Sequence, residues 1–283
     1  MIAKISVFGG RGFIGGEFRR TYPDEVEVID RDMTASNYPS ILDFVSTIDN
    51  YNVKTDPFLD IETNLRLLVE KLQNAKIIYG ASAVYNFISS WFVYGKTKIP
   101  ASEDSPCWPK GFYAVTKLCA EQLIESYCTT FGMQFRILRL GNVIGIGNKK
   151  VSAKRSALQF MIRELAQGRE VGLYEDGTVR DFIDARDAVS AIHLILEKGE
   201  PNQIYNVANG HGWNVGHLVD HAWAEAGYTG KINLVPAPEF HKQVQTNIMY
   251  LDVGKLKNLG YVQQYDIKQS VASLVEYYKN NET

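Results

Sequence analysis

Apolar residues gather along this chain in short runs, separated by longer stretches in which they recur every three or four positions. The short runs, bounded by turn-forming residues, predict β-strands, and the longer spacing predicts amphipathic helices. The predicted strands cover residues 5–8, 25–30, 41–47, 76–79, 84–88 and 134–140. The predicted helices cover residues 16–20, 59–72, 111–131, 158–166 and 187–197.

This alternation of strands and helices implies an α/β fold with a parallel, doubly wound sheet. Ligands of such a sheet bind at the carboxyl ends of its strands, so residues that follow the strands are expected to face one crevice. Only about ten residues separate the second predicted strand from the third, whereas a crossover between parallel neighbours needs a dozen or more. One helix–strand unit after the second strand is therefore expected to be missing.

The composition narrows the class of protein. The chain has 283 residues, of which 45% are hydrophobic and 22% charged, and its net charge is −2. These values are typical of a soluble globular protein and favour neither a nucleic-acid nor a membrane partner. The cysteines are odd in number and lack the spacing of metal ligands: Cys107, Cys119 and Cys128. They are expected to be reduced thiols, which predicts a cytoplasmic protein with no metal site.

A glycine-rich turn follows the first predicted strand and precedes a helix. Its glycines are Gly9, Gly12 and Gly15. This spacing permits a tight turn, a close approach of the backbone to a pyrophosphate, and close packing of helix on strand. The backbone N–H groups of Phe13 and Ile14 would then face the phosphates at the start of the helix. The alternative is a turn that binds nothing, because a glycine pattern alone is a weak signal.

An acid at the end of the second predicted strand strengthens the dinucleotide interpretation. Asp30 stands near the position of a carboxylate that accepts hydrogen bonds from a ribose. Such a carboxylate repels a 2′-phosphate, so NAD is favoured as the cofactor. NADP stays possible, since Arg11 or Arg31 could pair with that phosphate. Ser46, in the third predicted strand, is also expected to contact the cofactor.

Tyr113 and Lys117 stand four residues apart and share one face of a predicted helix. A lysine ammonium can stabilise a phenolate, so this tyrosine could exchange a proton at neutral pH. The partner chemistry would be hydride transfer to a nicotinamide cofactor. The alternative is a chance pair, in which an amphipathic helix carries an exposed lysine and a half-buried tyrosine.

Taken in order, these residues resemble the extended short-chain dehydrogenase/reductase family, in its NAD-dependent nucleotide-sugar epimerase/dehydratase branch. The matching segments are Gly9-Gly10-Arg11-Gly12-Phe13-Ile14-Gly15, Ser89-Ser90-Trp91-Phe92-Val93-Tyr94-Gly95, Tyr113-Ala114-Val115-Thr116-Lys117 followed by Glu121, Arg139-Leu140-Gly141-Asn142-Val143-Ile144-Gly145, and Asp176-Gly177-Thr178-Val179-Arg180-Asp181-Phe182-Ile183. The resemblance covers nearly the whole chain and implies a Rossmann sheet. Residues 1–145, completed by parts of 179–207, would form the dinucleotide-binding domain. Residues 146–283 would mainly form a smaller C-terminal substrate-binding subdomain.

The resemblance also implies a role for each candidate residue. Tyr113 would be the acid/base, Lys117 would bind the nicotinamide ribose and lower the pKa of the tyrosine, and Ser90 would hydrogen-bond the reacting oxygen. Ser82, which also follows a predicted strand, is expected to be a decoy. Asn142 and Arg180 would hold the diphosphate of a nucleotide sugar. The structural alternatives are a turn residue at Asn142, and an ion pair of Arg180 with Asp181 or Asp184.

The chain departs from the family pattern in several places. Trp91 and Phe92 replace the acid pair that sugar 4,6-dehydratases use, which argues against dehydration. Ile146 stands where a proline is usual. An acid that often contacts adenine is missing with the absent helix–strand unit. Near the C-terminus, where a second phosphate-binding arginine is common, only His241 and Lys242 stand.

These features favour NAD-dependent epimerisation of a nucleotide-diphosphate sugar through a 4-keto intermediate. A nucleotide-sugar 4-ketoreductase or dehydrogenase with exchangeable NAD(P)H would use the same residues and stays open. So does a binding protein that senses a dinucleotide without turnover. The resemblance further implies a homodimer, through the helices near residues 61–73 and 112–130.

Overall fold

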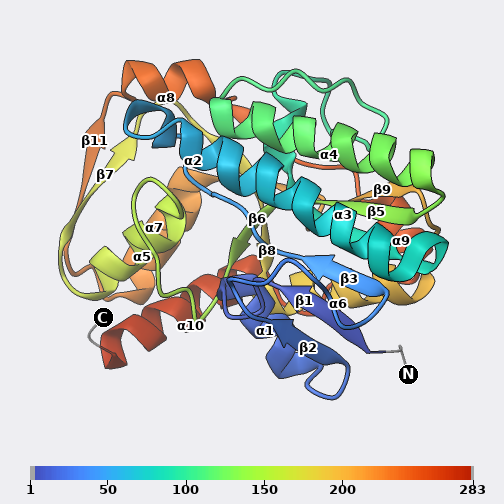
Figure 1. Ribbon diagram of the computed structural model, residues 1–283. Coiled ribbons are helices and arrows are strands. Elements are labelled where there is room, and N and C mark those ends of the chain that lie inside the picture. Colours follow the sequence, from blue (N-terminus) through green and yellow to red (C-terminus); the bar gives the residue numbers. More distant parts are fainter. Residues whose placement is uncertain (1–3, 282–283) are drawn as a thin grey trace.

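The computed structural model describes residues 4–281 and is built on a six-stranded parallel sheet (Figure 1). The strand order is β2-β1-β3-β4-β5-β9. These strands are β1 (Ile5–Phe8), β2 (Val26–Ile29), β3 (Ser40–Asp43), β4 (Val84–Ser90), β5 (Gln134–Leu140) and β9 (Gln203–Val207). Both flanks of β1 are occupied, so β2 and β3 are its neighbours and do not pair with each other. The predicted doubly wound parallel sheet is confirmed.

Helices cover both faces of this sheet, as the sequence predicts. On one face α1 (Phe13–Thr21) packs against α6 (Ala185–Lys198), and on the other α3 (Leu67–Tyr79) packs against α4 (Phe112–Phe131) (Figure 1). Side chains that alternate along the strands reach opposite cores. In β3, Leu42 belongs to the core under α1 and α6, whereas Ile41 belongs to the core under α3 and α4. This alternation follows from the two-residue period of a strand.

The connection from β2 to β3 is the shortened one. Within the described residues, 30–39 form neither helix nor strand, so the chain passes from one flank of β1 to the other without a crossover helix. The strand β2 is consequently the edge of the sheet. This agrees with the expectation that one helix–strand unit is missing.

Three predicted elements differ from the structure. Residues 76–79 form the last turn of α3 rather than a strand, and Ile77 and Ile78 lie 66% and 50% exposed on that helix. A four-residue apolar run cannot by itself distinguish a strand from a helix end. The predicted strand 41–47 ends early at Asp43. The predicted helix 59–72 is divided into α2 (Phe58–Ile61), a π-helical turn (Glu62–Arg66) and α3.

The remaining strands lie beyond the carboxyl ends of the sheet. One group joins β6 (Asn142–Ile144), β8 (Val179–Asp184), β10 (Gly212–Asn214) and β12 (Ile248–Met249), and β7 (Glu170–Tyr174) pairs with β11 (Lys231–Val235). The helices here are α5 (Ala157–Ala166), α7 (Val215–Glu225), α8 (Glu239–Val244), α9 (Gly254–Asn258) and α10 (Ile267–Asn280). Buried residues of α5, α7 and α10 share a core of their own. Over residues 4–281, no helix is long and apolar enough to cross a membrane.

Candidate active site

Ser90 ends β4, the central strand that lies between β3 and β5. Its side chain is half-buried, and its Oγ accepts a hydrogen bond from the backbone N–H of Phe92 at 3.3 Å. Ser82 lies elsewhere, in the exposed turn after α3, where its hydroxyl donates to the Tyr79 carbonyl at 2.8 Å. Of the two serines, only Ser90 is therefore at the carboxyl end of the sheet.

Tyr113 lies in the first turn of α4, which begins after Gly111. Its side chain is only 7% exposed. Burial raises the pKa of its hydroxyl to about 12, and hydrogen bonds to Ser90 and Ser46 oppose that rise. The structure thus brings together Tyr113 and two serines that come from different strand ends. With this pKa, Tyr113 carries its proton at neutral pH.

Lys117 lies one turn further along α4 and is 1% exposed. Its Nζ donates to the carbonyl of Ile88 at 2.6 Å and lies 3.9 Å from the centre of the Phe87 ring. Burial lowers its pKa to about 7, although the carboxylates of Asp43 and Glu121 act to raise it. The lysine is thus anchored on β4 directly beneath the segment that carries Ser90.

The glycine turn has the geometry that a pyrophosphate needs. Gly9 has φ +76°, a conformation that favours glycine, and a Cβ on Gly15 would lie 2.5 Å from the carbonyl oxygen of Gly9. Gly12 precedes α1 and has no side chain that could cap the helix. The N–H groups of Phe13 and Ile14 therefore donate no hydrogen bond to a capping side chain at Gly12. Such an uncapped helix start is suited to an anion.

Asp30 and Arg11 form an exposed ion pair beside this turn. Arg11 Nη2 lies 2.5 Å from Asp30 Oδ1, and the two side chains are 65% and 56% exposed. The carboxylate follows β2, where a ribose-binding acid is expected. Arg31 is also exposed. Ser46 follows β3, and its hydroxyl donates to the Thr47 carbonyl at 2.6 Å. The glycine cradle and this acid fit a dinucleotide.

Arg180 is buried on β8 without a carboxylate partner among the described residues. It is 7% exposed, and its Nη1 donates to the carbonyls of Val179 and Asn247, both at 2.9 Å. Neither Asp181 nor Asp184 pairs with it: Asp181 accepts backbone N–H groups, and Asp184 pairs with Arg186. The structural alternative for Arg180 is therefore wrong.

Two further contacts connect Arg180 with the rest of the site. Its guanidinium lies 5.1 Å from the centre of the Trp91 ring, and Trp91 immediately follows Ser90. Asn142 is half-buried on β6, which pairs with β8, and its side chain donates to the Asp181 carbonyl at 3.0 Å. Arg180 and Asn142 thus lie on neighbouring strands at the same end of the sheet as Ser90.

Sequence reasoning missed a polar cluster behind Tyr113. Asn64 is buried in the π-helical turn and donates to the hydroxyls of Thr47 and Thr116, at 2.8 Å and 3.0 Å. Asp60 is fully buried, and one of its carboxylate oxygens has no hydrogen-bond partner among the described residues. Its charge also raises the pKa of Tyr113. Polar residues that interrupt the apolar stripe of helix 59–72 were the available signal.

Comparison with known proteins decides the family. The family model described as NAD dependent epimerase/dehydratase matches residues 41–208. The chain belongs to this family. It is an NAD(P)-dependent enzyme of the extended short-chain dehydrogenase/reductase type, and the resemblance inferred from its motifs is confirmed.

Several relatives in this family act on nucleotide sugars. The chain is 28% identical over 242 residues to GDP-6-deoxy-D-mannose reductase of Pseudomonas aeruginosa, covering 78% of this chain and 79% of that protein. It is 26% identical to a putative UDP-glucose 4-epimerase of Methanocaldococcus jannaschii, covering 77% of this chain and 68% of the relative. The fold is similar to UDP-glucose 4-epimerase of Thermotoga maritima with UDP-glucose, with a TM-score of 0.86, 21% identity and coverage of 98% and 99%.

Proposed function

We propose that this enzyme catalyses NAD-dependent epimerisation of a nucleotide-diphosphate sugar at C4, through a 4-keto intermediate. The observation that carries the proposal is the arrangement around Tyr113. Its buried hydroxyl interacts with the hydroxyls of Ser90 and Ser46, one helical turn from the buried amino group of Lys117. The glycine turn lies at the same end of the sheet.

The residues divide the chemistry among themselves. NAD, when bound at the glycine turn, supplies the hydride acceptor. Tyr113, in its ionised form, takes the proton of the C4 hydroxyl and later returns a proton to the same oxygen. Ser90 donates a hydrogen bond to that oxygen as its charge develops. Lys117 binds the nicotinamide ribose, and its ammonium favours the ionised tyrosine. The keto-sugar turns between the two hydride transfers.

The segment after Ser90 argues against sugar dehydration. Trp91 and Phe92 stack at 4.0 Å, and the Phe92 ring meets Tyr113 edge to face at 6.0 Å. An apolar surface therefore stands beside the reacting oxygen, and positions 91 and 92 provide no carboxyl group to expel a C6 hydroxyl. We infer oxidation and reduction at one carbon as the whole of the chemistry.

Substrate and cofactor would bind to different parts of the chain. Residues 1–145 and parts of 179–207 would hold the cofactor, which we propose is NAD because Asp30 is a ribose acceptor. Residues 146–283 would mainly hold the nucleotide sugar, with Arg180 and Asn142 at its diphosphate. Relatives whose names specify UDP-glucose and GDP-6-deoxy-D-mannose support this class of substrate.

A 4-ketoreductase is the second candidate, and one observation favours it. Tyr113 carries its proton at neutral pH, which suits a tyrosine that protonates a ketone oxygen as hydride arrives. A related protein is named as a reductase of a GDP-sugar. A dinucleotide sensor is disfavoured, because such a protein has no use for Ser90, Tyr113 and Lys117 together.

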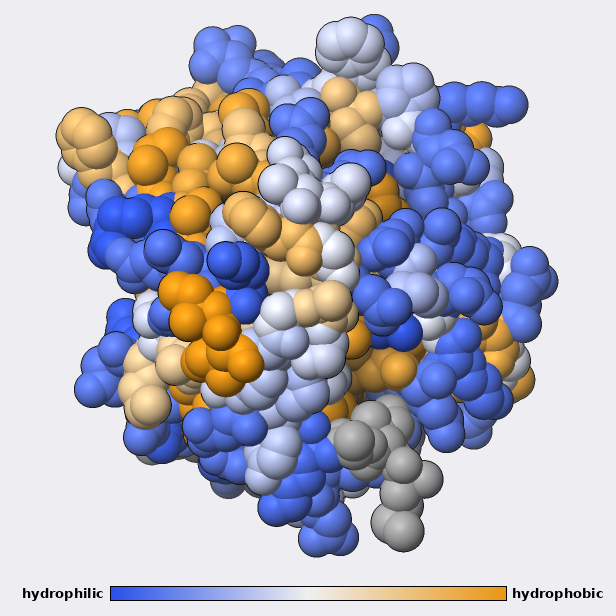
Figure 2. Space-filling view, turned by 45° about the vertical axis from the view of Figure 1, so that its right-hand side comes forward, coloured by the Kyte–Doolittle hydropathy of each residue, from blue (hydrophilic) through white to orange (hydrophobic). Residues whose placement is uncertain are grey.

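We further propose a homodimer located in the cytoplasm. All three cysteines are free thiols, which suits a reducing compartment. Exposed apolar side chains occupy neighbouring positions on the paired helices α3 and α4: Val69, Ile77, Ile78, Val115, Leu123 and Phe131. Figure 2 shows apolar side chains gathered on the left-hand half of the visible face. A second copy of this chain is the partner that the family resemblance implies.

The test is a panel of UDP-, GDP- and dTDP-sugars followed by proton NMR, with and without NAD. An epimerase gives a mixture of C4 epimers with catalytic NAD and no net change in reduced cofactor. A reductase or dehydrogenase gives a product in proportion to the cofactor consumed. The Tyr113→Phe variant is the control, and no conversion of any nucleotide sugar by the wild type would contradict the proposal.

A further inference from the structure

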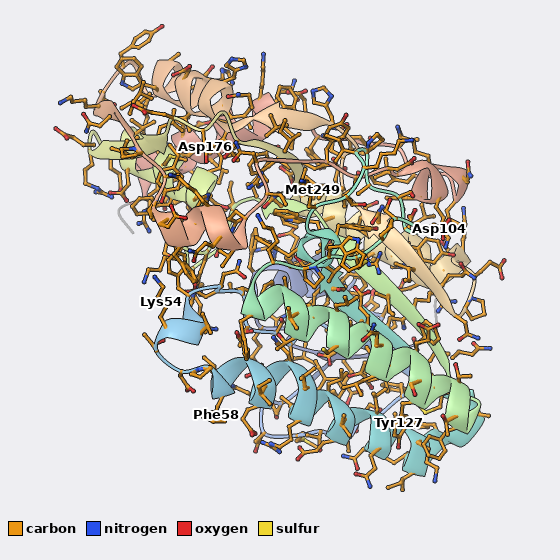
Figure 3. The ribbon with its side chains drawn as sticks, turned by 90° about the horizontal axis from the view of Figure 1, so that it is seen from above. Lys54, Phe58, Asp104, Tyr127, Asp176 and Met249 are labelled. Atoms are coloured by element: carbon orange, nitrogen blue, oxygen red, sulfur yellow. The ribbon has the colours of Figure 1, made fainter. Side chains whose placement is uncertain are left out.

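Unpartnered polar side chains gather where α8 and the segment after it cross β8. The Nε2 of His241 and the hydroxyl of Thr246 are buried with no hydrogen-bond partner among the described residues. The imidazole meets the ring of Tyr174 edge to face at 4.8 Å. Figure 3 labels two residues of this region, Asp176 and Met249. Asp176 precedes β8, and Met249 of β12 pairs with Arg180 of β8. Buried polar groups are rarely left unpaired, so this group points to a ligand.

The charge at this place is positive, and among the described residues no carboxylate forms an ion pair with Arg180. Arg180 donates to the carbonyls of Val179 and Asn247 and, at 3.4 Å, to the side-chain oxygen of Gln245. These oxygens are all uncharged. Burial lowers the pKa of Arg180 to about 10, although the charge of Asp176 acts to raise it. A buried cation that lacks a carboxylate is unfavourable unless an anion binds beside it. An anion is therefore the class of ligand that this group fits.

We propose that His241 binds the diphosphate of the nucleotide sugar together with Arg180, and does so as the imidazolium. One proton is then taken up when the substrate binds. This inference rests on the proposed function, and it assigns the second cationic ligand of the diphosphate. His241 and Lys242 lie in the C-terminal region where the family pattern commonly has a second phosphate-binding arginine, and of the two Lys242 is exposed beside Glu239. A diphosphate diester carries two negative charges that two cations would match.

The direction of the pH dependence follows from the groups that face His241. These are Arg180 from β8, Asp176 from the turn before it, and Tyr174 from β7. Burial, and then the charge of Arg180, hold the pKa of His241 below its ordinary value, while Asp176 acts to raise it. Without an anion the imidazole is neutral at pH 7. A bound diphosphate raises this pKa, so affinity is greatest at low pH and falls as the pH rises through the pKa of bound His241.

The test is calorimetric titration of the NAD-loaded protein with UDP-glucose, a GDP-hexose and a dTDP-hexose. Nucleotide sugars are preferred to nucleoside diphosphates, because a diphosphate diester keeps its charge over the range used. We expect the wild type to lose about tenfold in affinity from about pH 6 to about pH 8. Buffers of different ionisation enthalpy should report uptake of close to one proton. His241→Gln should bind weakly at both pH values, and His241→Arg should bind tightly at both.

Matched controls isolate the imidazole. The control variant is His217→Gln, because His217 is exposed on α7. Its affinity for the nucleotide sugar should keep the wild-type pH dependence. Asp181 and Lys117 have pKa values of about 7 and titrate in the same range, but they are present in every variant. A wild-type pH dependence in His241→Gln would overturn the inference while leaving the proposed function intact. Failure of every nucleotide sugar to bind the wild type would overturn both.

Discussion

At the scale of single residues, we propose that Asp30 and Arg11 set the preference between the two nicotinamide cofactors. The two side chains form an exposed ion pair after β2, so a carboxylate and a guanidinium lie side by side there. The carboxylate would accept hydrogen bonds from a ribose diol, and the guanidinium would pair with a 2′-phosphate if the carboxylate were removed.

Changing Asp30 to Ala should therefore turn the preference toward NADP. We expect NAD to bind about tenfold more weakly and NADP to bind more tightly, because a loss of about 1.4 kcal/mol corresponds to that factor. Direct titration of both cofactors checks this. Arg31→Ala serves as the comparison, since Arg31 is exposed but has no ion-pair partner among residues 4–281. An unchanged NAD/NADP ratio in Asp30→Ala would be evidence against this role.

Asp60 is the buried carboxylate whose charge bears on Tyr113. Because its charge raises the pKa of the tyrosine, Asp60→Asn should lower that pKa. The rate that depends on ionised Tyr113 should then begin to rise at a pH lower by about one unit. The pH–rate profile of the substrate found in the nucleotide-sugar panel is the measurement. Glu62→Gln, an exposed change in the neighbouring turn, should leave the profile in place. A shift of Asp60→Asn toward higher pH would show that another effect dominates.

At the scale of elements, the positions of the side chains come from strand ends and from helix starts. Ser90 and Asp43 end strands, the glycine turn follows one, and Tyr113 lies in the first turn of a helix. Periodicity and turn residues predict such places well, so Ser90, Tyr113 and Lys117 could be proposed as catalytic residues from the sequence. The π-helical turn at Glu62–Arg66 could not, because it depends on what packs against it. That turn carries Asn64, whose role in the hydrogen-bond network is visible only in three dimensions.

A buried ion pair joins α3 to β3 below the site. Lys71 Nζ lies 2.8 Å from Asp43, which also accepts the hydroxyl of Tyr85 at 2.7 Å. Lys71→Met leaves this carboxylate without its cation and should lower the free energy of unfolding by about 3–5 kcal/mol. Urea denaturation measures the free energy of unfolding. The control is Lys76→Met, an exposed change on the same helix, which should alter that free energy by less than about 0.5 kcal/mol.

The double variant Asp43→Leu with Lys71→Met tests whether the loss of stability comes from the unpaired carboxylate. Removing both charges should cost less than removing the lysine alone, because no uncompensated charge then stays buried. If Lys71→Met is as stable as the wild type, the pair does not hold α3 on the sheet.

At the scale of the whole molecule, the exposed apolar face of α3 and α4 is the feature to explain. Leu123 and Val115 lie on α4 at a helical spacing of two turns, and Val69 and Ile77 repeat this spacing on α3. Two such helix pairs can bury these side chains against each other.

Leu123→Glu should convert the proposed dimer to a monomer, because two carboxylates would be buried close together across a twofold axis. Sedimentation velocity measures the change. Val262→Glu, exposed outside this face at 69%, should remain a dimer. A wild type that sediments as a monomer at all concentrations would contradict the homodimer.

The central claim is that Tyr113 moves the proton when hydride leaves the sugar carbon. It is tested most directly by mixing NAD-saturated protein with its nucleotide sugar and following the absorbance of reduced nicotinamide in a single turnover. Tyr113→Phe should slow this step by about 10²–10⁴-fold while NAD binds as tightly as to the wild type. A Tyr113→Phe rate within about twofold of the wild type would contradict the account.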